Sequence, residues 1–239
     1  ELCACLQVCL MNGWMMIRVA DIVLSLIAII GLSPVLIICA MVLKFTGEGE
    51  IIYVQKRIGR NKAVFGCFKF ATMVKDSEKI GTKTLTVQDD PRVLPVGKIL
   101  RKYKLNELPQ LGNILLGQMS VIGPRPLVAA AFNQYPSELQ DKISTYSPGL
   151  SGIGSLVFRD EERLLDREDS VRFYEDHILP YKAQLEEWFF QNRNIKTYFL
   201  LIILTIICLP IKGTKLPWRV FKSLPHPKET LGKELFKTY

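Results

Sequence analysis

The sequence has little of what hydrolytic, nucleotide-hydrolysing or dehydrogenase chemistry needs. Only two histidines occur, His177 and His226, and they stand far apart in the chain, so no Ser-His-Asp set is expected. A Walker-type glycine-rich loop and a dinucleotide-binding fingerprint are both absent. These absences argue against serine hydrolases, P-loop nucleotide hydrolases and dinucleotide-dependent dehydrogenases.

Cysteine is present without a pattern. Three of the six cysteines crowd the first ten residues, two lie inside apolar runs, and Cys67 stands alone. No pair has the spacing of a zinc site. We therefore expect a reduced, cytosol-facing protein in which oxygen atoms hold any metal ion.

Hydrophobic and basic residues are both plentiful. The 239 residues suffice for one domain with appendages or for two small domains, and we favour one. Hydrophobic residues make up 49% of the chain and the formal net charge is +8. This combination indicates an anionic membrane surface before it indicates nucleic acid. The basic segments also lack interleaved aromatics, so no nucleic-acid partner is expected.

The longest apolar run extends from Ile22 to Leu43 without a charge. Its length alone predicts a transmembrane helix. However, Ser33 and Pro34 fall near its middle, and proline removes a backbone donor and clashes with the preceding turn. Each half would rise only about 15 to 18 Å as a helix, which is short of a hydrocarbon core of roughly 30 Å.

The charges that flank this run bear on its topology. Arg18 precedes it and Lys44 follows it, so the positive-inside rule places both ends on the cytoplasmic side. A helix that enters the bilayer, bends at Ser33-Pro34 and leaves by the same face satisfies this rule. A kinked spanning helix remains the alternative on the residues alone.

A second apolar run covers residues 198–211 and follows an aromatic segment that includes Trp188 and Phe189. Aromatic residues near lysine and arginine suit a helix that lies in the membrane interface. A buried core helix is the alternative. The basic stretch 212–239, with its prolines and scattered aromatics, is interpreted as a surface-bound tail.

The middle of the chain predicts a basic hairpin and a basic helix. Residues 50–59 alternate like a strand, and residues 63–73 read as its partner. After a polar linker over residues 76–90, a helix is expected from about Val96. The cations on these elements suit phosphate groups: Lys56, Arg57, Arg60, Lys69, Lys98, Arg101, Lys102 and Lys104.

The stretch "NELPQL" predicts a helix start. Asn106 is a preferred N-cap residue, Glu107 would lie in the first turn, and Gly117 would close the helix. Such a helix start can also bind phosphate or a metal-phosphate group. Next, "SVIGPRP" predicts a short strand that delivers Arg125 on a rigid turn.

Glycines and acids dominate "YSPGLSGIGSLVFRDEERLL". We expect its glycines to be flexible. Asp160, Glu161 and Glu162 are interpreted as solvated acids in the first turn of a helix.

Several of these motifs, in this order, resemble one family. Its carriers are "RVADIVLSLIAIIGLSPV", "VQKRIGRN", "FKFATM", "DDPRVLPVGKILRKYKLNELPQL", "GQMSVIGPRP" and "YSPGLSGIGSLVFRDEE". Together they resemble the bacterial sugar transferases, which are monotopic phosphoglycosyl transferases. The resemblance covers residues 18–159 and extends toward residue 211.

The resemblance implies a monotopic membrane protein of α/β type that is mostly helical. Its parts would be a tail over residues 1–17 that need not be native, a re-entrant helix over 18–44 broken at Ser33-Pro34, a compact cytoplasmic sugar transferase domain over 45–182, and interfacial helices with a basic tail over 183–239. The implied location is the cytoplasmic face of the bacterial inner membrane. A homodimer is also among the expected assemblies.

The implied activity is transfer of a sugar 1-phosphate from a UDP-sugar to undecaprenyl phosphate, with Mg²⁺ as cofactor and UMP as the second product. This reaction begins the assembly of O-antigen, capsule or exopolysaccharide. A non-catalytic membrane scaffold, or a module that only binds nucleotide sugar, is the alternative.

The resemblance also implies the site residues. An Asp-Glu dyad of the family corresponds to Asn106 and Glu107, with Glu107 as the ligand of Mg²⁺. Lys69, Arg101 and Arg125 correspond to residues that contact phosphate, and we add Arg57 of the basic hairpin.

Asn106 departs from the family nucleophile, because a neutral amide is a poor attacking group. Three readings follow: a native asparagine with another group as nucleophile, an Asp-to-Asn variant, or a degenerate member that acts as a scaffold. Two further departures are Ala71 for an arginine and Gln118 for an aspartate.

Overall fold

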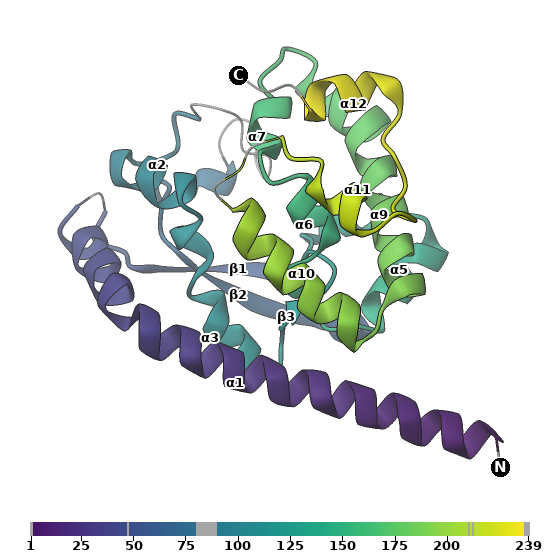
Figure 1. The fold of residues 1–239 in the computed structure, drawn as a ribbon. Coiled ribbons are helices and arrows are strands. Elements are labelled where there is room, and N and C mark those ends of the chain that lie inside the picture. The colour runs from purple at the N-terminus through teal and green to yellow at the C-terminus, as the bar shows by residue number, and fades with distance from the viewer. Residues whose placement is uncertain (1, 47, 80–89, 210, 212, 237–239) are drawn as a thin grey trace.

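The computed structural model describes residues 2–46, 48–79, 90–209, 211 and 213–236. Most of the polar linker expected at 76–90 lies outside these residues. Within them the fold is mostly helical, with two two-stranded sheets, and it rests on one long N-terminal helix (Figure 1).

The elements follow one another in short pieces after the first helix. The α-helices are α1 Leu2–Phe45, α2 Pro95–Lys102, α3 Gln110–Leu115, α4 Ala129–Phe132, α5 Ser137–Ser144, α6 Ile153–Val157, α7 Glu161–Leu164, α8 Ser170–Phe173, α9 Leu179–Asn192, α10 Ile195–Cys208, α11 Leu216–Val220 and α12 Glu229–Leu235. The strands are β1 Ile52–Ile58, β2 Val64–Phe70, β3 Ser120–Ile122 and β4 Gly149–Ser151. Short 3₁₀ helices cover Arg60–Lys62, Ser77–Lys79 and Leu105–Glu107, and a π-helical turn, Tyr174–Ile178, leads into α9.

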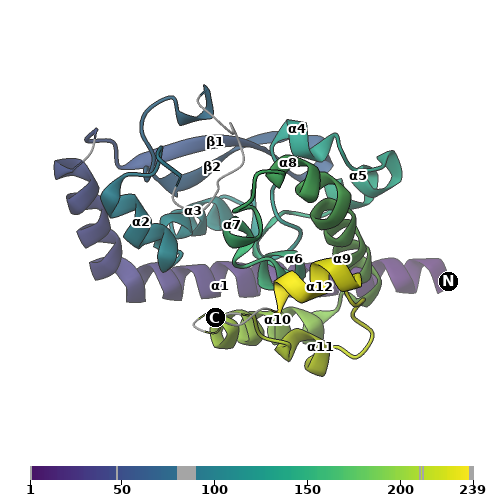
Figure 2. The ribbon, with the colours of Figure 1, turned by 90° about the horizontal axis from the view of Figure 1, so that it is seen from above.

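Helix α1 bends in its last third without losing its helical assignment (Figures 1 and 2). Pro34 lies inside the helix and has no N–H to donate to the carbonyl of Ile30, four residues earlier. The hydroxyl of Ser33 donates to that carbonyl instead, at 2.8 Å. The break expected at Ser33-Pro34 therefore takes the form of a bend in one continuous helix, and the expected boundary at residue 17 also falls within this helix.

One face of α1 is uncovered and strongly apolar. The helix is long and apolar enough to cross a membrane over Gly13–Phe45, and little of this span is buried. Its opposite face packs on the domain; near the C-terminal end, Cys39 and Leu43 contact Phe70 and Leu100. The exposed large apolar side chains are Trp14, Met15, Met16, Val19, Val23, Leu26, Ile27, Ile30, Ile37, Ile38, Met41, Val42 and Phe45.

Two charged residues fasten the first part of α1 to the domain. Arg18 donates to the carbonyls of Ile114 and Leu115, at 2.6 and 3.0 Å. These carbonyls belong to the last turn of α3, where helical acceptors lack partners and a cation is favoured by the helix dipole.

Asp21 makes the second fastening, and it is buried. One carboxylate oxygen accepts hydrogen bonds from the Ser120 hydroxyl at 3.0 Å, the Val121 N–H at 2.8 Å and the Tyr198 hydroxyl at 2.7 Å. Because these donors belong to β3 and α10, a single oxygen joins three elements that are distant in sequence.

The basic hairpin forms as predicted. Strands β1 and β2 are antiparallel, and Tyr53 lies opposite Lys69. A 3₁₀ turn connects them, with Asn61 and Lys62 at φ of 55° and 58°. Residues directly opposite in an antiparallel pair share one face, so the register sets which hairpin cations point the same way.

Strands β3 and β4 are parallel, with Ser120 opposite Gly149 and Ile122 opposite Ser151. A Cβ atom added to Gly123 would meet the carbonyl oxygen of Ser147 at 2.6 Å, and one added to Gly152 would meet the carbonyl oxygen of Gly123 at 2.2 Å. The glycines that we expected to be flexible instead permit this close approach. That expectation was wrong because the pairing of β3 with β4 is long-range.

Helix α9 belongs to the core. Leu185, Trp188 and Phe189 are buried there, together with Leu224 and Leu231 from the C-terminal segment. The interfacial interpretation of Trp188 and Phe189 was therefore wrong, and the expected boundary at residue 182 falls inside α9. Helix α10 combines both alternatives, since it buries one face and exposes another. Its buried residues are Thr197, Tyr198, Leu201, Leu204 and Cys208, and its exposed ones include Phe199, Ile203, Ile206 and Ile207.

Asn106 does not cap a helix. Helix α3 begins only at Gln110, with Pro109 at the N-cap position, and Asn106 lies in the preceding 3₁₀ helix without a side-chain cap. Pro109 explains the difference, because its position separates the 3₁₀ turn from α3. Gly117, at φ of 81°, follows the end of α3 as predicted.

The Asp21 network yields a stability prediction. Asp21→Ala leaves buried donors of Ser120, Val121 and Tyr198 without an acceptor, and we expect it to lower the free energy of unfolding by about 2–4 kcal/mol. Asp21→Asn keeps an acceptor oxygen and should lose less. Denaturant unfolding in detergent measures both. Equal losses in the two variants would contradict the role assigned to the acceptor.

Candidate functional site

The candidate site is built around Glu107, in the 3₁₀ helix that follows α2. Arg125 reaches it from the loop after β3, with 3.4 Å between Nη2 of Arg125 and Oε1 of Glu107. Lys69 of β2 and Arg57 of β1 also lie close enough to act on the charge of Glu107. Three segments distant in sequence thus bring their cations to one carboxylate.

The cations dominate the electrostatics of Glu107. Burial by itself would raise the pKa of its carboxyl, but Arg125, Lys69, Lys104 and Arg57 together lower this pKa to about 2. Glu107 is therefore ionised throughout the physiological range. Four cations act on this carboxylate, so positive charge exceeds negative charge immediately around Glu107, although Glu161 also acts on Arg125, and Asp160 and Glu162 act on Lys104.

The surplus of positive charge affects the protonation of Lys69. Burial and the neighbouring charge of Arg57 lower the pKa of its ammonium group to about 8, although Glu107 acts in the opposite direction. Burial also lowers the pKa of Lys104. An anionic ligand would relieve this repulsion, so the arrangement suits a phosphate-bearing molecule.

Arg57 also links the hairpin to the Arg125 loop. Its Nη1 donates to the carbonyl of Pro126 at 3.0 Å, and its Nε donates to the side chain of Gln55 at 3.1 Å. The orientation of Arg57 is thus fixed by contacts on both sides.

Arg101 lies beside this cluster and not in contact with Glu107. It donates to Glu162 at 2.7 Å. Lys182 donates to Glu161 at 2.6 Å in a partly buried pair. The view of Glu161 and Glu162 as merely solvated acids was therefore wrong, because basic residues far away in the sequence pair with both.

Asn106 has an unusual environment. It is buried, and its Oδ1 atom has no hydrogen-bond partner in the structure. Buried polar atoms normally find partners, so an orphaned acceptor beside a charged site is characteristic of a functional position. The geometry leaves this oxygen available to a donor or a cation.

The residues allow one kind of metal site. Among the described residues, no group of three or more His, Cys, Asp or Glu could hold a metal ion. Mg²⁺, however, is commonly bound through one or two carboxylates together with phosphate oxygens and water. The ionised Glu107 fits such a cation and does not suit a metal that needs a complete protein cage.

Lys104, which was among the cations expected to suit phosphate, and Asn113, which was not singled out, also help to build the site. Lys104 precedes the 3₁₀ helix with φ of 57°, and its Nζ donates to the carbonyl of Arg159 at 3.1 Å. Asn113 of α3 accepts from the N–H of Phe68 at 2.8 Å and donates to the carbonyl of Gly66 at 2.7 Å, which fixes β2 against α3. The closeness of Lys104 to Glu107 in the sequence indicated a role for Lys104 in the site. Nothing local in the sequence indicates the role of Asn113.

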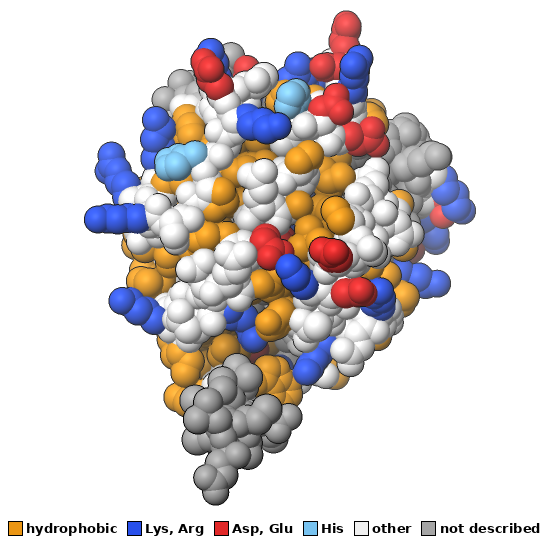
Figure 3. Space-filling model, turned by 90° about the vertical axis from the view of Figure 1, so that its right-hand side faces the viewer, with side chains coloured by type: hydrophobic (Ala, Val, Ile, Leu, Met, Phe, Trp, Pro, Cys, Tyr) orange, Lys and Arg blue, Asp and Glu red, His pale blue; other side chains and the backbone are white. Residues whose placement is uncertain are grey.

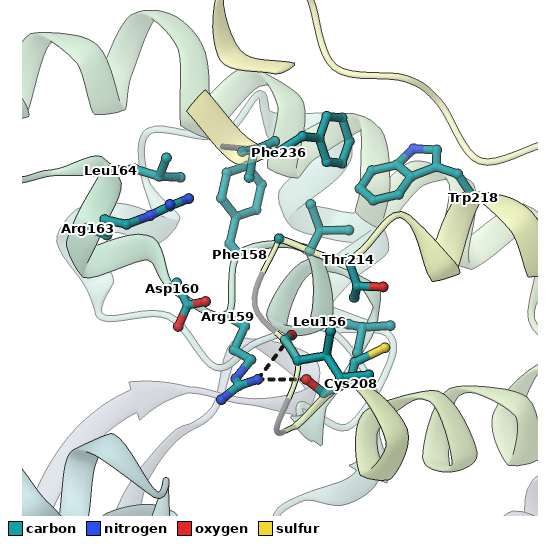
Figure 4. Close-up of a pocket in the computed structure, with 14 residues that line it drawn as sticks. Leu156, Phe158, Arg159, Asp160, Arg163, Leu164, Cys208, Thr214, Trp218 and Phe236 are labelled. Atoms are coloured by element: carbon teal, nitrogen blue, oxygen red, sulfur yellow. Dashed lines mark hydrogen bonds between the residues drawn. The ribbon is translucent and has the colours of Figure 1, made fainter. Parts of the chain in front are cut away.

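A hollow lies on the far side of Arg159 (Figure 4). The guanidinium of Arg159 donates to the carbonyls of Cys208 and Ile211 at 2.6 and 3.3 Å, where α10 ends. Trp218 and Phe236 line the same hollow from the C-terminal segment. Arg159 therefore connects two regions. Its guanidinium lines the hollow, and its backbone carbonyl accepts a hydrogen bond from Lys104 of the Glu107 cluster.

Away from the site, charge is mixed. The face that is turned toward the viewer in Figure 3 carries basic and acidic side chains side by side. Exposed ion pairs elsewhere on the surface, such as Lys142 with Glu187 at 2.9 Å, also bring opposite charges together. The concentration of cations around Glu107 thus distinguishes this cluster from the face with mixed charge.

Known proteins resemble the chain over most of its length. The exopolysaccharide production protein ExoY of Sinorhizobium fredii is 36% identical over 158 residues, which cover 60% of this chain and 70% of the relative. The UDP-glucose:undecaprenyl-phosphate glucose-1-phosphate transferase of Escherichia coli is 34% identical over 190 residues, which cover 77% of this chain and 39% of the relative. The undecaprenyl-phosphate galactose phosphotransferase of Salmonella typhimurium is 34% identical over 159 residues, with coverages of 60% and 33%.

A family model gives the broadest match. The model for bacterial sugar transferases matches residues 12–211, which include most of α1, the basic hairpin, the Glu107 cluster and α10. With its relatives among the undecaprenyl-phosphate sugar phosphotransferases, this chain belongs to the bacterial sugar transferase family and is a phosphoglycosyl transferase.

Proposed function

We propose that the protein transfers a sugar 1-phosphate from a UDP-sugar to undecaprenyl phosphate, releases UMP and so initiates the assembly of a bacterial glycan. The observation that carries this proposal is the cluster of Arg57, Lys69, Lys104 and Arg125 around the ionised Glu107. Its surplus charge suits a diphosphate, and the names of two relatives include undecaprenyl phosphate.

The proposed roles follow from charge and position. Lys69, Arg57 and Arg125 bind phosphate oxygens of the nucleotide sugar, and Arg101 extends the positive surface toward Glu162. Glu107 holds Mg²⁺, which, when bound, neutralises charge on the phosphate oxygens. Partial burial of Lys69 strengthens its interaction with phosphate.

Asn106 supports a second candidate function. An amide cannot supply the carboxylate nucleophile that the family resemblance implies, and its Oδ1 atom is buried without a partner. A membrane module that binds nucleotide sugar without turnover would need the cations and not the nucleophile. The transferase proposal therefore requires Glu107 or another group, and not Asn106, to act as the nucleophile.

We further propose that α1 is re-entrant and that the domain lies on the cytoplasmic face of the inner membrane. Both parts of α1 contact the domain, the first through Arg18 and Asp21 and the last through Cys39 and Leu43. A straight spanning helix would carry one end away from the domain. Each large apolar side chain on the uncovered face gains roughly 1.5–3 kcal/mol by leaving water, which drives the helix into lipid.

The first prediction concerns turnover. Glu107→Ala should reduce release of nucleoside monophosphate by about 100-fold or more, because the proposed metal loses its ligand and the cations lose the carboxylate that all four of them face. The assay uses detergent-purified protein, undecaprenyl phosphate, Mg²⁺ and a panel of UDP-sugars. Glu187→Ala, an exposed change elsewhere, is the control.

Asn106→Asp is measured in the same assay. A faster variant would identify a disabled dyad, whereas an unchanged or slower one would show that the amide belongs to the native chemistry. Nucleotide-sugar binding without turnover in the unaltered protein and both variants would contradict the transferase proposal and favour the binding module.

The second prediction concerns pH. Since the pKa of Lys69 is about 8 in the free protein, its charge is present below this pH and is lost above it. We expect kcat/KM for the UDP-sugar to fall as the pH rises through about 8. Lys69→Arg, which stays charged, should remove this alkaline fall. An identical profile in the variant would exclude Lys69 as its source.

The third prediction concerns topology. In a background without the six native cysteines, single cysteines at Met15 and Phe45 mark the two ends of the apolar segment. A membrane-impermeant maleimide should label neither in intact cells and both in inverted vesicles. Labelling of one end from outside would establish a spanning helix instead.

A further inference from the structure

The loop that presents Arg125 lies between β1 and β4. Backbone hydrogen bonds hold it on both sides, and these bonds do not depend on side-chain donors. They are Gly123 N–H to the Ser151 carbonyl at 2.9 Å, Gly149 N–H to the Pro124 carbonyl at 2.8 Å, and Ile58 N–H to the Leu127 carbonyl at 2.9 Å.

The Pro126 carbonyl in the same loop is held by a side chain. Its donor is Arg57 of β1, whose Nη1 lies 3.0 Å from the carbonyl oxygen. The two residues are 69 positions apart in the sequence. Because Pro126 directly follows Arg125, the orientation of the Arg57 guanidinium bears on the place from which the Arg125 side chain leaves the backbone.

The orientation of this guanidinium is set by Gln55. An arginine side chain is long and flexible, so contacts at its head decide where the guanidinium points. Both Nε and Nη2 of Arg57 donate to Oε1 of Gln55, at 3.1 and 2.5 Å. A guanidinium has donors and no acceptor, so the amide oxygen of Gln55 must face it. Two N–H groups that converge on one oxygen fix both the position and the plane of the guanidinium.

The hairpin explains why Gln55 can make this contact. Side chains at alternate positions of a strand share a face, so Gln55 and Arg57 are neighbours on one face of β1. Both are half-buried, whereas Val54 on the other face is exposed. Lys69 shares the half-buried face, because it lies opposite Tyr53 in the register. Gln55 therefore lies on the face that carries two cations of the candidate site.

Arg57 acts both in the fold and in the site. Its Nη1 holds the Pro126 carbonyl, and its charge acts on Glu107. Without the acceptor of Gln55, the guanidinium gains rotational freedom. The Pro126 carbonyl and the carboxylate of Glu107 then both lose a fixed partner.

We propose that Gln55 is a positioning residue for Arg57: its amide oxygen fixes the guanidinium that holds the Pro126 carbonyl, and so sets the place of the Arg125 loop beside Glu107. The inference rests on the proposed function for the effect of Arg57 and Arg125 on the UDP-sugar. The link from Gln55 to the loop is tested without any turnover.

Hydrogen exchange at the Ile58 amide reports on this link, because this amide bonds to the loop one residue beyond Pro126. Gln55→Met keeps the length of the side chain and removes its amide oxygen. In this variant Ile58 should exchange at least about 10-fold faster. Gln55→Glu keeps an acceptor oxygen, so its exchange at Ile58 should stay within about twofold of the unaltered protein.

Two controls separate the loop from the hairpin as a whole. The Ala71 amide donates to the Ile51 carbonyl at 3.0 Å, beside the opposite end of the hairpin, and its exchange should not change in any variant. Val54→Thr, on the exposed face of β1, should leave both amides unchanged. Unchanged exchange at Ile58 in Gln55→Met, or equal acceleration at Ala71, would overturn the proposal.

A double-mutant cycle then tests whether Gln55 acts through Arg57. We expect Gln55→Met to lower kcat/KM for the UDP-sugar by about 10-fold and Val54→Thr to leave it within about twofold. The double variant Gln55→Met/Arg57→Met should be no worse than Arg57→Met alone. Losses that multiply would overturn the proposal. If no form of the protein turns over a UDP-sugar, the proposed function fails, and the exchange at Ile58 still decides the role of Gln55.

Discussion

The carboxylate of Asp21 is the interaction on which the rest of the structure depends, because it joins the apolar helix to the body of the domain. It binds β3 and α10 at once, and Arg18, one turn earlier, holds the end of α3. Apolar packing alone would let α1 rotate or slide with little penalty. Buried hydrogen bonds are directional, so this network sets both the rotation of the helix and its position along the domain.

The same strand that Asp21 fixes leads directly into the Arg125 loop. The position of α1 and the direction of Arg125 are therefore coupled through β3, which has only three residues. Glycines on both sides allow β3 and β4 to approach, and the hairpin closes against the loop through Arg57. The positively charged cluster is thus held by rigid backbone contacts, and its repulsion is not relieved by movement of the loop.

Local chemistry in the sequence predicted the elements whose causes are local. Alternation predicted the hairpin, Gly117 the end of α3, and Pro34 with Ser33 the bend of α1. The failures had long-range or positional causes. Pro109 placed the start of α3 later than the Asn106 cap predicted, the glycines of β4 serve a strand pairing, and Glu161 finds Lys182 only through the folding of α9.

The C-terminal segment has a consequence for the order in which the protein folds. Leu224, Leu231 and Leu235 belong to the same core as Ile122. During synthesis, the parts that resemble the family emerge from the ribosome well before these leucines do. The apolar helix is made first. The core of the domain stays incompletely packed until its last residues have been synthesised. Contacts between such distant positions slow folding, so this core stays open to solvent in the nascent chain until the last leucines have emerged.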